Sequence, residues 1–181
     1  MPYEPPPELA ELTLSQIAEQ VAARKLPPVE GWAPEREGDS RMRIAADGTW
    51  YHDGSPITRT AMTRAFSSLL VREEDGAHYL LSPFEKLSIE VEDAAFIATD
   101  CRKAEDGLAF RLNTDELVIA GPDNPLRAAG DTDAPAIYIH VRRGCEARLN
   151  RSTYEQLAQI ALESDDDWTV ESQGERFRLV P

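Results

Sequence analysis

The chain has 181 residues, which suits one domain or two small ones, and a hydrophobic content of 41% allows an ordinary core. It carries 33 acidic and 19 basic residues, so its formal net charge is −14. This balance opposes non-specific binding to nucleic acid and to anionic membranes, because both need a basic surface. The chain opens without a secretory signal pattern, and no apolar run approaches the ~20 residues of a membrane helix. The sequence therefore predicts a cytoplasmic protein.

Cys101 and Cys145 are the only cysteines, and neither belongs to a CxxC pair. A disulfide between them would need a geometry that spacing alone does not supply. We therefore expect two free thiols.

The first 29 residues predict a lead followed by a short amphipathic helix. Residues 2–8, PYEPPPE, are acidic and proline-rich, which predicts an extended segment. Thr13 followed by Gln16 resembles a capping box, and Pro27 and Pro28 end the helix. Apolar residues recur at helical spacing, namely Leu14, Ile17, Ala18 and Val21.

Residues 30–82 predict a first α+β half. Asp-Gly pairs, which are strong turn signals, occur at 47–48, 53–54, 75–76 and 106–107. The first pair predicts a hairpin of residues 42–45 and 49–52, and the third precedes a short strand at 78–81. Between them a helix is expected from Thr60, with an apolar face of Met62, Phe66, Leu69 and Leu70. Pro83 ends the strand and is the expected domain boundary.

Residues 83–181 are richer in strand patterns. Strands are predicted at 86–91, 95–102, 108–113, 116–120, 137–142 and 145–149. Residues 121–135, rich in glycine and proline, predict a long exposed loop. A last helix with Tyr154, Leu157, Ala158 and Ala161 inward precedes a hairpin of residues 168–171 and 176–180. Because no strand–helix–strand rhythm appears, the predicted class is α+β with antiparallel sheets throughout.

One match between the halves suggests duplication. Residues 54–64, GSPITRTAMTR, and 146–156, EARLNRSTYEQ, lie 92 positions apart. Each segment places an apolar residue, a small polar residue and an arginine ahead of a helix. The identity between them is very low, so internal comparison leaves both duplication and chance open.

Sequence motifs of common enzymes and metal sites are absent. The chain has no phosphate-binding loop, no GxGxxG opening a helix and no GxSxG motif. His52, His78 and His140 lie far apart, without the spacing of zinc ligands. We therefore assign no catalytic residue, metal or cofactor. Carboxylates such as Glu85 and Glu92 leave acid–base catalysis open as an alternative.

An anion site is the one positive chemical hypothesis. Arg59 and Arg151 each precede a helix beside a hydroxyl residue, Thr60 or Ser152, and Ser152 with Glu155 resembles a capping box. The amide groups and dipole of a helix N-terminus favour anions, and an arginine adds a bidentate donor. The alternative is that these are ordinary surface arginines.

Several motifs in order resemble the bacterial family called domain of unknown function 1285. They are Gly-Asp before Met-Arg-Ile (38–39 and 42–44), Asp-Gly-Thr-Trp (47–50), Gly-Ser-Pro-Ile (54–57), Pro-x-Glu-Lys (83–86) and Val-Glu-Asp-Ala (91–94). The resemblance spans about residues 30–162. Ser40 and Phe84 depart from the family pattern, which has aliphatic residues there.

The resemblance implies two halves related by duplication, the second similar to a pleckstrin-homology barrel capped by a helix. It also implies a nucleotide-like ligand site at the interface of the halves and a role in signal transduction. We therefore predict a non-enzymatic protein that binds a small anionic ligand; a protein-interaction module is the other alternative to an enzyme. The expected ligand-binding residues are Asp39, Arg43, Trp50, Arg59, Lys86 and Arg151.

The expected roles follow the chemistry of these side chains. Arg59 and Lys86 would neutralise phosphate, Trp50 would stack on a base, and Asp39 would accept hydrogen bonds from a sugar or an amine. For Trp50 a place in the core is the open alternative.

Overall fold

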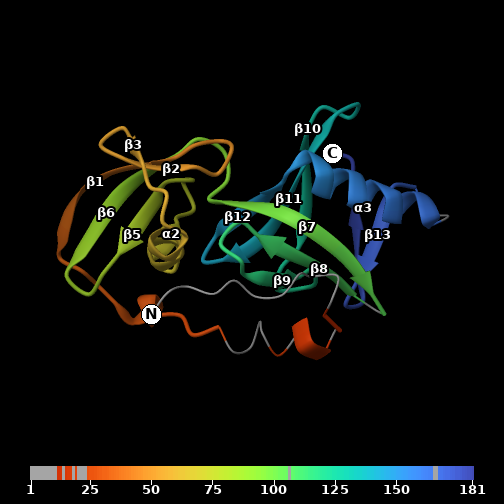
Figure 1. Ribbon diagram of the computed structural model, residues 1–181, viewed down its shortest axis with the longest axis horizontal. Helices are drawn as coiled ribbons and strands as arrows, with labels where there is room; N and C mark the ends of the chain where they lie inside the picture. Colours follow the sequence, from red (N-terminus) through yellow and green to blue (C-terminus); the bar gives the residue numbers. More distant parts are fainter. Residues whose placement is uncertain (1–11, 14, 18, 20–23, 106, 165–166) are drawn as a thin grey trace. The chain divides into compact units, whose positions relative to one another are not determined.

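The computed structural model describes residues 12–13, 15–17, 19, 24–105, 107–164 and 167–181. These residues form two units (Figure 1). The first unit contains Lys25–Ala95 together with the turn Arg142–Cys145. The second contains Phe96–Val141 and Glu146–Pro181, with the described residues up to Arg24. The predicted proline-rich lead lies outside the described residues.

The first unit is built on a six-stranded sheet with the order β3-β2-β1-β6-β5-β4. One α-helix lies between its third and fourth strands in the chain. A short 3-10 helix, Val29–Gly31, precedes the sheet. The elements are β1 Arg36–Ile44, β2 Trp50–His52, β3 Ser55–Pro56, α2 Thr60–Ser67, β4 Leu70–Arg72, β5 His78–Leu81 and β6 Glu85–Val91.

The core of the first unit lies on one face of this sheet. Alternate residues of neighbouring strands are buried, and Trp50 stacks on Phe66 of α2 with ring centroids 6.3 Å apart. This contact places α2 over the same face, so the other face of the sheet carries the alternating polar residues. The buried strand residues are Ile44, Trp50, Leu70, Leu80 and Ile89.

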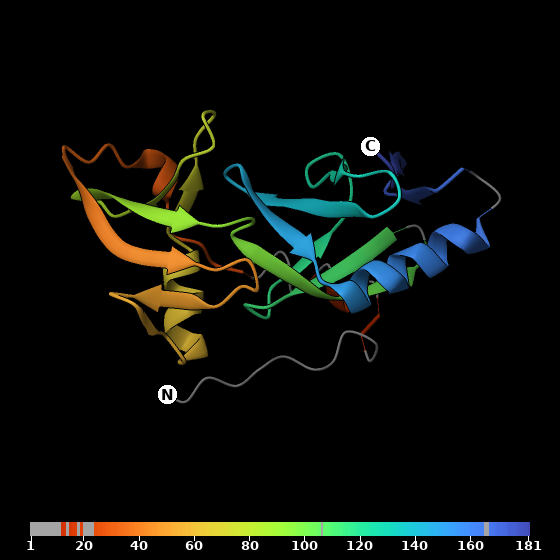
Figure 2. The same cartoon turned by 90° about the horizontal axis from the view of Figure 1, so that it is seen from above.

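The second unit is built on a sheet with the order β10-β11-β12-β7-β8-β9 and a separate two-stranded sheet. Helix α3 follows the sixth strand and lies along β7 (Figure 2). Leu157 and Ala161 are its buried apolar residues, as the helical spacing predicts. The elements are β7 Phe96–Ala104, β8 Gly107–Leu112, β9 Leu117–Ile119, β10 Leu126–Gly130, β11 Pro135–Arg142, β12 Cys145–Leu149, α3 Arg151–Glu163, β13 Thr169–Ser172 and β14 Glu175–Arg178.

Each large sheet contains one parallel pair of strands. In the first sheet β1 runs parallel to β6, and in the second β7 runs parallel to β12. The antiparallel ladders are β1–β2, β2–β3, β4–β5, β5–β6, β7–β8, β8–β9 and β10–β11. The prediction of antiparallel sheets throughout was therefore wrong for one pair in each sheet. Each sheet joins two three-stranded meanders through its first and sixth strands, and such long-range pairing leaves no local sequence signal.

The two sheets share one strand order, which is consistent with duplication. When the six strands of each sheet are numbered in chain order, both sheets have the strand order 3-2-1-6-5-4. The first strands begin at residues 36 and 96 and the sixth at 85 and 145, a shift of 60 in both cases. The similarity between residues 54–64 and 146–156, which lie 92 positions apart, therefore does not come from this repeat. It aligns α2, which precedes the fourth strand, with α3, which follows the sixth.

The division between the units falls between Ala95 and Phe96. The expected boundary, Pro83, instead lies inside the first unit, because β6 after it pairs with both β1 and β5. Two further differences are local. Leu70, expected on the helix, belongs to β4, and the expected loop 121–135 contains β10.

The turns predicted from the Asp-Gly pairs are confirmed in part. Gly48, Gly54 and Gly76 of the first three Asp-Gly pairs have positive φ angles, as tight turns need. Asp106 of the fourth lies outside the described residues.

The N-terminal capping box is confirmed. The Thr13 amide donates to the Gln16 side chain over 2.9 Å, and the Gln16 amide donates to the Thr13 hydroxyl over 3.2 Å. Ile17 is buried against Ala109 and Leu117, whereas the predicted Leu14, Ala18 and Val21 lie outside the described residues.

Both cysteines are free and buried. Burial raises the pKa of the Cys101 thiol to about 12, helped by the nearby Asp100 carboxylate, and burial raises that of Cys145 to about 11. Both thiols are therefore protonated near neutral pH. Among the described residues, no helix has the length and apolar character needed to span a membrane.

Candidate functional site

Strand β1 has a β-bulge where it pairs with β6, in the middle of the first sheet. Asp39 lies opposite Ser88 and Arg43 lies opposite Glu90, so residues 40–42 of β1 face the single residue 89 of β6. Arg41, at the centre of the bulge, has φ 55°, a left-handed conformation that is uncommon for a residue with a side chain. The bulge therefore re-aims the side chains on either side of it.

Two side chains hold the bulge in place. The Asp39 carboxylate accepts the Arg41 amide over 2.8 Å. The Ser40 hydroxyl accepts the Met42 amide over 3.1 Å and donates to the Ser88 carbonyl over 2.7 Å. These bonds take the place of ladder bonds that the bulge removes, so Ser40, a departure from the family pattern, is part of the local geometry.

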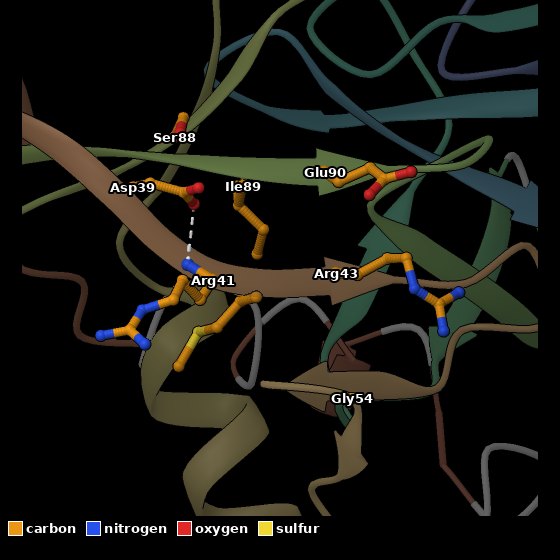
Figure 3. A pocket seen from close by; sticks show the side chains of 8 residues that line it. Asp39, Arg41, Arg43, Gly54, Ser88, Ile89 and Glu90 are labelled. Carbon is orange, nitrogen blue, oxygen red and sulfur yellow. Dashed lines mark hydrogen bonds between the residues drawn. The ribbon is translucent and has the colours of Figure 1, made fainter.

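A pocket of about 480 Å³ opens at this bulge (Figure 3). Its volume lies within the range of small-molecule sites. Arginine and carboxylate side chains share its lining with a small apolar part. The lining residues are Asp39, Arg41, Met42, Arg43, Gly54, Ser88, Ile89 and Glu90.

Carboxylates outside the pocket orient its two arginines. Arg43 pairs with Glu92 and lies over the Tyr51 ring, with its guanidinium carbon 4.3 Å from the ring centroid. Glu92 also accepts the Ala46 amide over 2.8 Å, which fixes this carboxylate. Arg41 lies 3.5 Å from Asp53 and its side chain is 72% exposed. Arg43 is therefore the better held of the two cations.

Strand alternation places Lys86, another predicted cation, on the same face as Arg43. Lys86, Ser88 and Glu90 point to one side of β6, the side on which Arg43 lies opposite Glu90. Lys86 pairs with Glu73, and its ammonium nitrogen lies 4.2 Å from the centroid of the Tyr79 ring. The hydrogen bond to Glu73 raises the pKa of Lys86. Asp39, Arg43 and Lys86 thus share the polar face of the sheet, and two of them line the pocket.

Trp50 lies in the core of the first unit. It is 3% exposed and stacks on Phe66, which is the alternative that the sequence left open for this residue. The aromatic ring that packs beneath Arg43 belongs to Tyr51, the residue after Trp50.

The structure does not bring Arg59 or Arg151 to this pocket. Arg59 is exposed at the N-cap of α2, and Thr60 supplies no side-chain cap. Arg151 belongs to the second unit, where its side chain is 93% exposed and pairs with Glu155 at 3.2 Å.

The expected capping box at Ser152 was wrong. Asn150 caps α3 by accepting the Thr153 amide over 2.9 Å. Asn150 lies two residues before Ser152, and asparagine and serine are both good acceptors for the unpaired amides of a first helical turn.

Sequence reasoning did not place Arg41, Ser88 and Glu90 in the site. Ser88 and Glu90 follow Lys86 at the spacing of one strand face, which is a signal that could have found them. Arg41 depends on the bulge, which has no clear sequence signature. Among the described residues, no group of three or more histidine, cysteine, aspartate or glutamate side chains could hold a metal ion.

Two family models match the chain. Residues 27–94 match the N-terminal domain of DUF1285, a domain of unknown function, and residues 95–179 match the C-terminal domain of DUF1285, a protein of unknown function. No curated protein shows significant similarity to the chain.

Two solved structures are similar to this protein. The crystal structure of a DUF1285 family protein from Silicibacter pomeroyi DSS-3 has a TM-score of 0.79 and 41% identity, over 92% of this chain and 94% of that one. A DUF1285 family protein from Shewanella baltica OS155 has a TM-score of 0.55 and 23% identity, over 65% of this chain and 90% of that one, and supports the fold alone. With both family models together spanning residues 27–179, the chain belongs to the DUF1285 family.

Proposed function

We propose that this protein is a non-enzymatic, cytoplasmic binding protein that senses a small ligand through the ligand's anionic group, as part of signal transduction. The observation that carries the proposal is the pocket at the β1 bulge, where Arg41 and Arg43 line a space of about 480 Å³. Nucleotides are the first ligand class to test, because the family resemblance implies a nucleotide-like ligand.

Arg43 is the residue to which we assign the anionic group. Its guanidinium carries five N–H donors, and the contact with Glu92 runs through Nη1, so other donors remain for a ligand. The Tyr51 ring beneath it restricts the guanidinium plane, which reduces the conformational entropy lost on binding. The ligand's anionic group would thus meet a donor already held in position.

Arg43→Ala tests this assignment. We expect the affinity for an anionic ligand to fall by about 10- to 150-fold, because a hydrogen bond to a charged group contributes about 1.5–3 kcal/mol. Isothermal titration calorimetry with a nucleotide panel measures the change.

Arg127→Ala is the matched control, because Arg127 lies over Tyr138 at 4.4 Å and pairs with Glu146 at 2.9 Å, but belongs to the second unit. Equal losses in both variants would reject the assignment to Arg43.

The two other functional classes give different results in the same experiments. An enzyme would consume a ligand that it binds, so release of product during calorimetry favours that class. A protein-interaction module would bind a protein partner with no small ligand present. The likeness of the second half to a pleckstrin-homology barrel stays a prediction from the family resemblance.

A further inference from the structure

The carboxylates of the pocket are as prominent as its arginines. Glu90 lies opposite Arg43 across the two strands and is exposed, and its carboxylate has no hydrogen-bond or ion-pair partner within the described part of the chain. Asp39 is also exposed, and it accepts one backbone amide, from Arg41. Both carboxylates keep unused acceptor positions, since an ionised carboxylate can accept about four hydrogen bonds.

The charges are arranged in two mixed pairs. Glu90 and Arg43 lie at one end of the pocket, and Asp39 and Arg41 lie at the other, with Ile89 between them (Figure 3). Each arginine also has a carboxylate neighbour, Glu92 or Asp53. The surroundings of the pocket therefore hold more negative than positive groups, and a ligand with negative charge alone is repelled by Glu90 and Asp39.

We infer that the ligand carries a protonated amine beside its anionic group, and that its chemical class is the amino acids. Arg43 would hold the carboxylate and Glu90 the ammonium group. Adjacent strands lie about 4.8 Å apart, so cross-strand partners can contact two neighbouring groups of one small molecule. This inference rests on the proposed function, because it assigns the anionic group to the same arginine.

A calorimetric and NMR titration tests this class directly. The probes are the twenty L-amino acids, together with the Nα-acetyl derivative of each, which keeps the α-carboxylate and lacks the charged α-ammonium group. We expect at least one amino acid to bind and to shift the backbone amide signals of residues 39–43 and 88–90. Its N-acetyl derivative should bind at least about tenfold more weakly, because the contact with Glu90 is lost.

Glu90→Gln tests whether Glu90 binds the ammonium group of the ligand independently of the carboxylate. This variant should lose at least about tenfold in affinity for the amino acid. It should lose no affinity for the N-acetyl derivative, because Glu90 only repels that ligand. Glu74→Gln is the control, because Glu74 is an exposed acid of the same unit outside the pocket. Its affinity for the amino acid should equal that of the unchanged protein.

The possible failures are distinguishable. If N-acetyl derivatives or nucleotides bind as tightly as amino acids, the amino-acid inference is overturned and the proposed anion site stands. If no amino acid, N-acetyl derivative or nucleotide binds, both are overturned. An unchanged affinity of Glu90→Gln for the amino acid also overturns the inference.

Discussion

Replacing Gly144 by alanine is expected to lower the free energy of unfolding by about 2–5 kcal/mol. Gly144 has φ 78°, a conformation that costs an L-residue about 1–2 kcal/mol. An added Cβ would also lie 2.6 Å from the Arg72 carbonyl oxygen and 3.3 Å from the Arg72 Cβ. The neighbouring backbone must then shift, at about 1–3 kcal/mol, and the shift acts on the 2.9 Å bond from the Arg72 amide to the Arg143 carbonyl.

Urea-induced unfolding followed by circular dichroism measures this change, and Gly174→Ala is its control. Gly174 has φ 79°, yet an added Cβ meets nothing within 4 Å. The control variant should therefore lose only the conformational part, about 1–2 kcal/mol. Equal losses at the two positions would mean that the close approach to Arg72 has no energetic weight.

Phe110→Ala should destabilise the protein by about 3–5 kcal/mol, which is the usual cost of deleting a buried aromatic ring. Phe110 is fully buried in β8, opposite Cys101 of β7 and Val118 of β9. Its removal leaves a cavity in the middle of the second sheet, which the neighbouring strands fill only in part. The midpoint of urea unfolding should fall while its slope stays unchanged.

Phe84→Ala provides the matched comparison for the same chemical change. Phe84 is 76% exposed in the turn between β5 and β6. Its replacement should change the free energy of unfolding by no more than about 0.5 kcal/mol. A larger loss at Phe84 than at Phe110 would contradict the burial described for both.

A shared arrangement of side chains supports the kinship of the halves. In the first unit Lys86 of β6 lies over Tyr79 of β5 and pairs with Glu73, which follows β4. In the second, Glu146 of β12 pairs with Arg127 of β10, which lies over Tyr138 of β11. Lys86 and Glu146 are the second residues of the two sixth strands, 60 positions apart. Both halves thus have a tyrosine beside an ion pair, but the sixth strand supplies the basic residue in the first half and the acidic residue in the second.

Short-range features of the fold could be predicted from the sequence. Asp-Gly pairs have left-handed glycines that specify turns, and the alternation of β11 follows from having one buried face. Strand β10, with the sequence LRAAG, has little intrinsic strand preference and forms by pairing with β11. The parallel pairs join strands about 50 residues apart along the chain, so their formation depends on tertiary contacts.

The candidate site was predictable only in part for a similar reason. Asp39 and Arg43 were expected and do line the pocket, but their separation across the bulge depends on Ser40 bridging Met42 and Ser88. Trp50 precedes Tyr51 on a strand, so the two point to opposite faces, and the sequence alone did not decide which faces the core. Positions of side chains near irregular backbone follow from such contacts rather than from periodicity.

Mapping of a bound ligand on the unmodified protein tests the central claim most directly. Backbone amide signals of the ¹⁵N-labelled full chain would be followed during titration with pooled amino acids and nucleotides. The account predicts saturable shifts centred on residues 39–43, 54 and 88–90, the lining of the pocket at the bulge. Saturable shifts confined to the second unit, or no shifts with any pool, would contradict it.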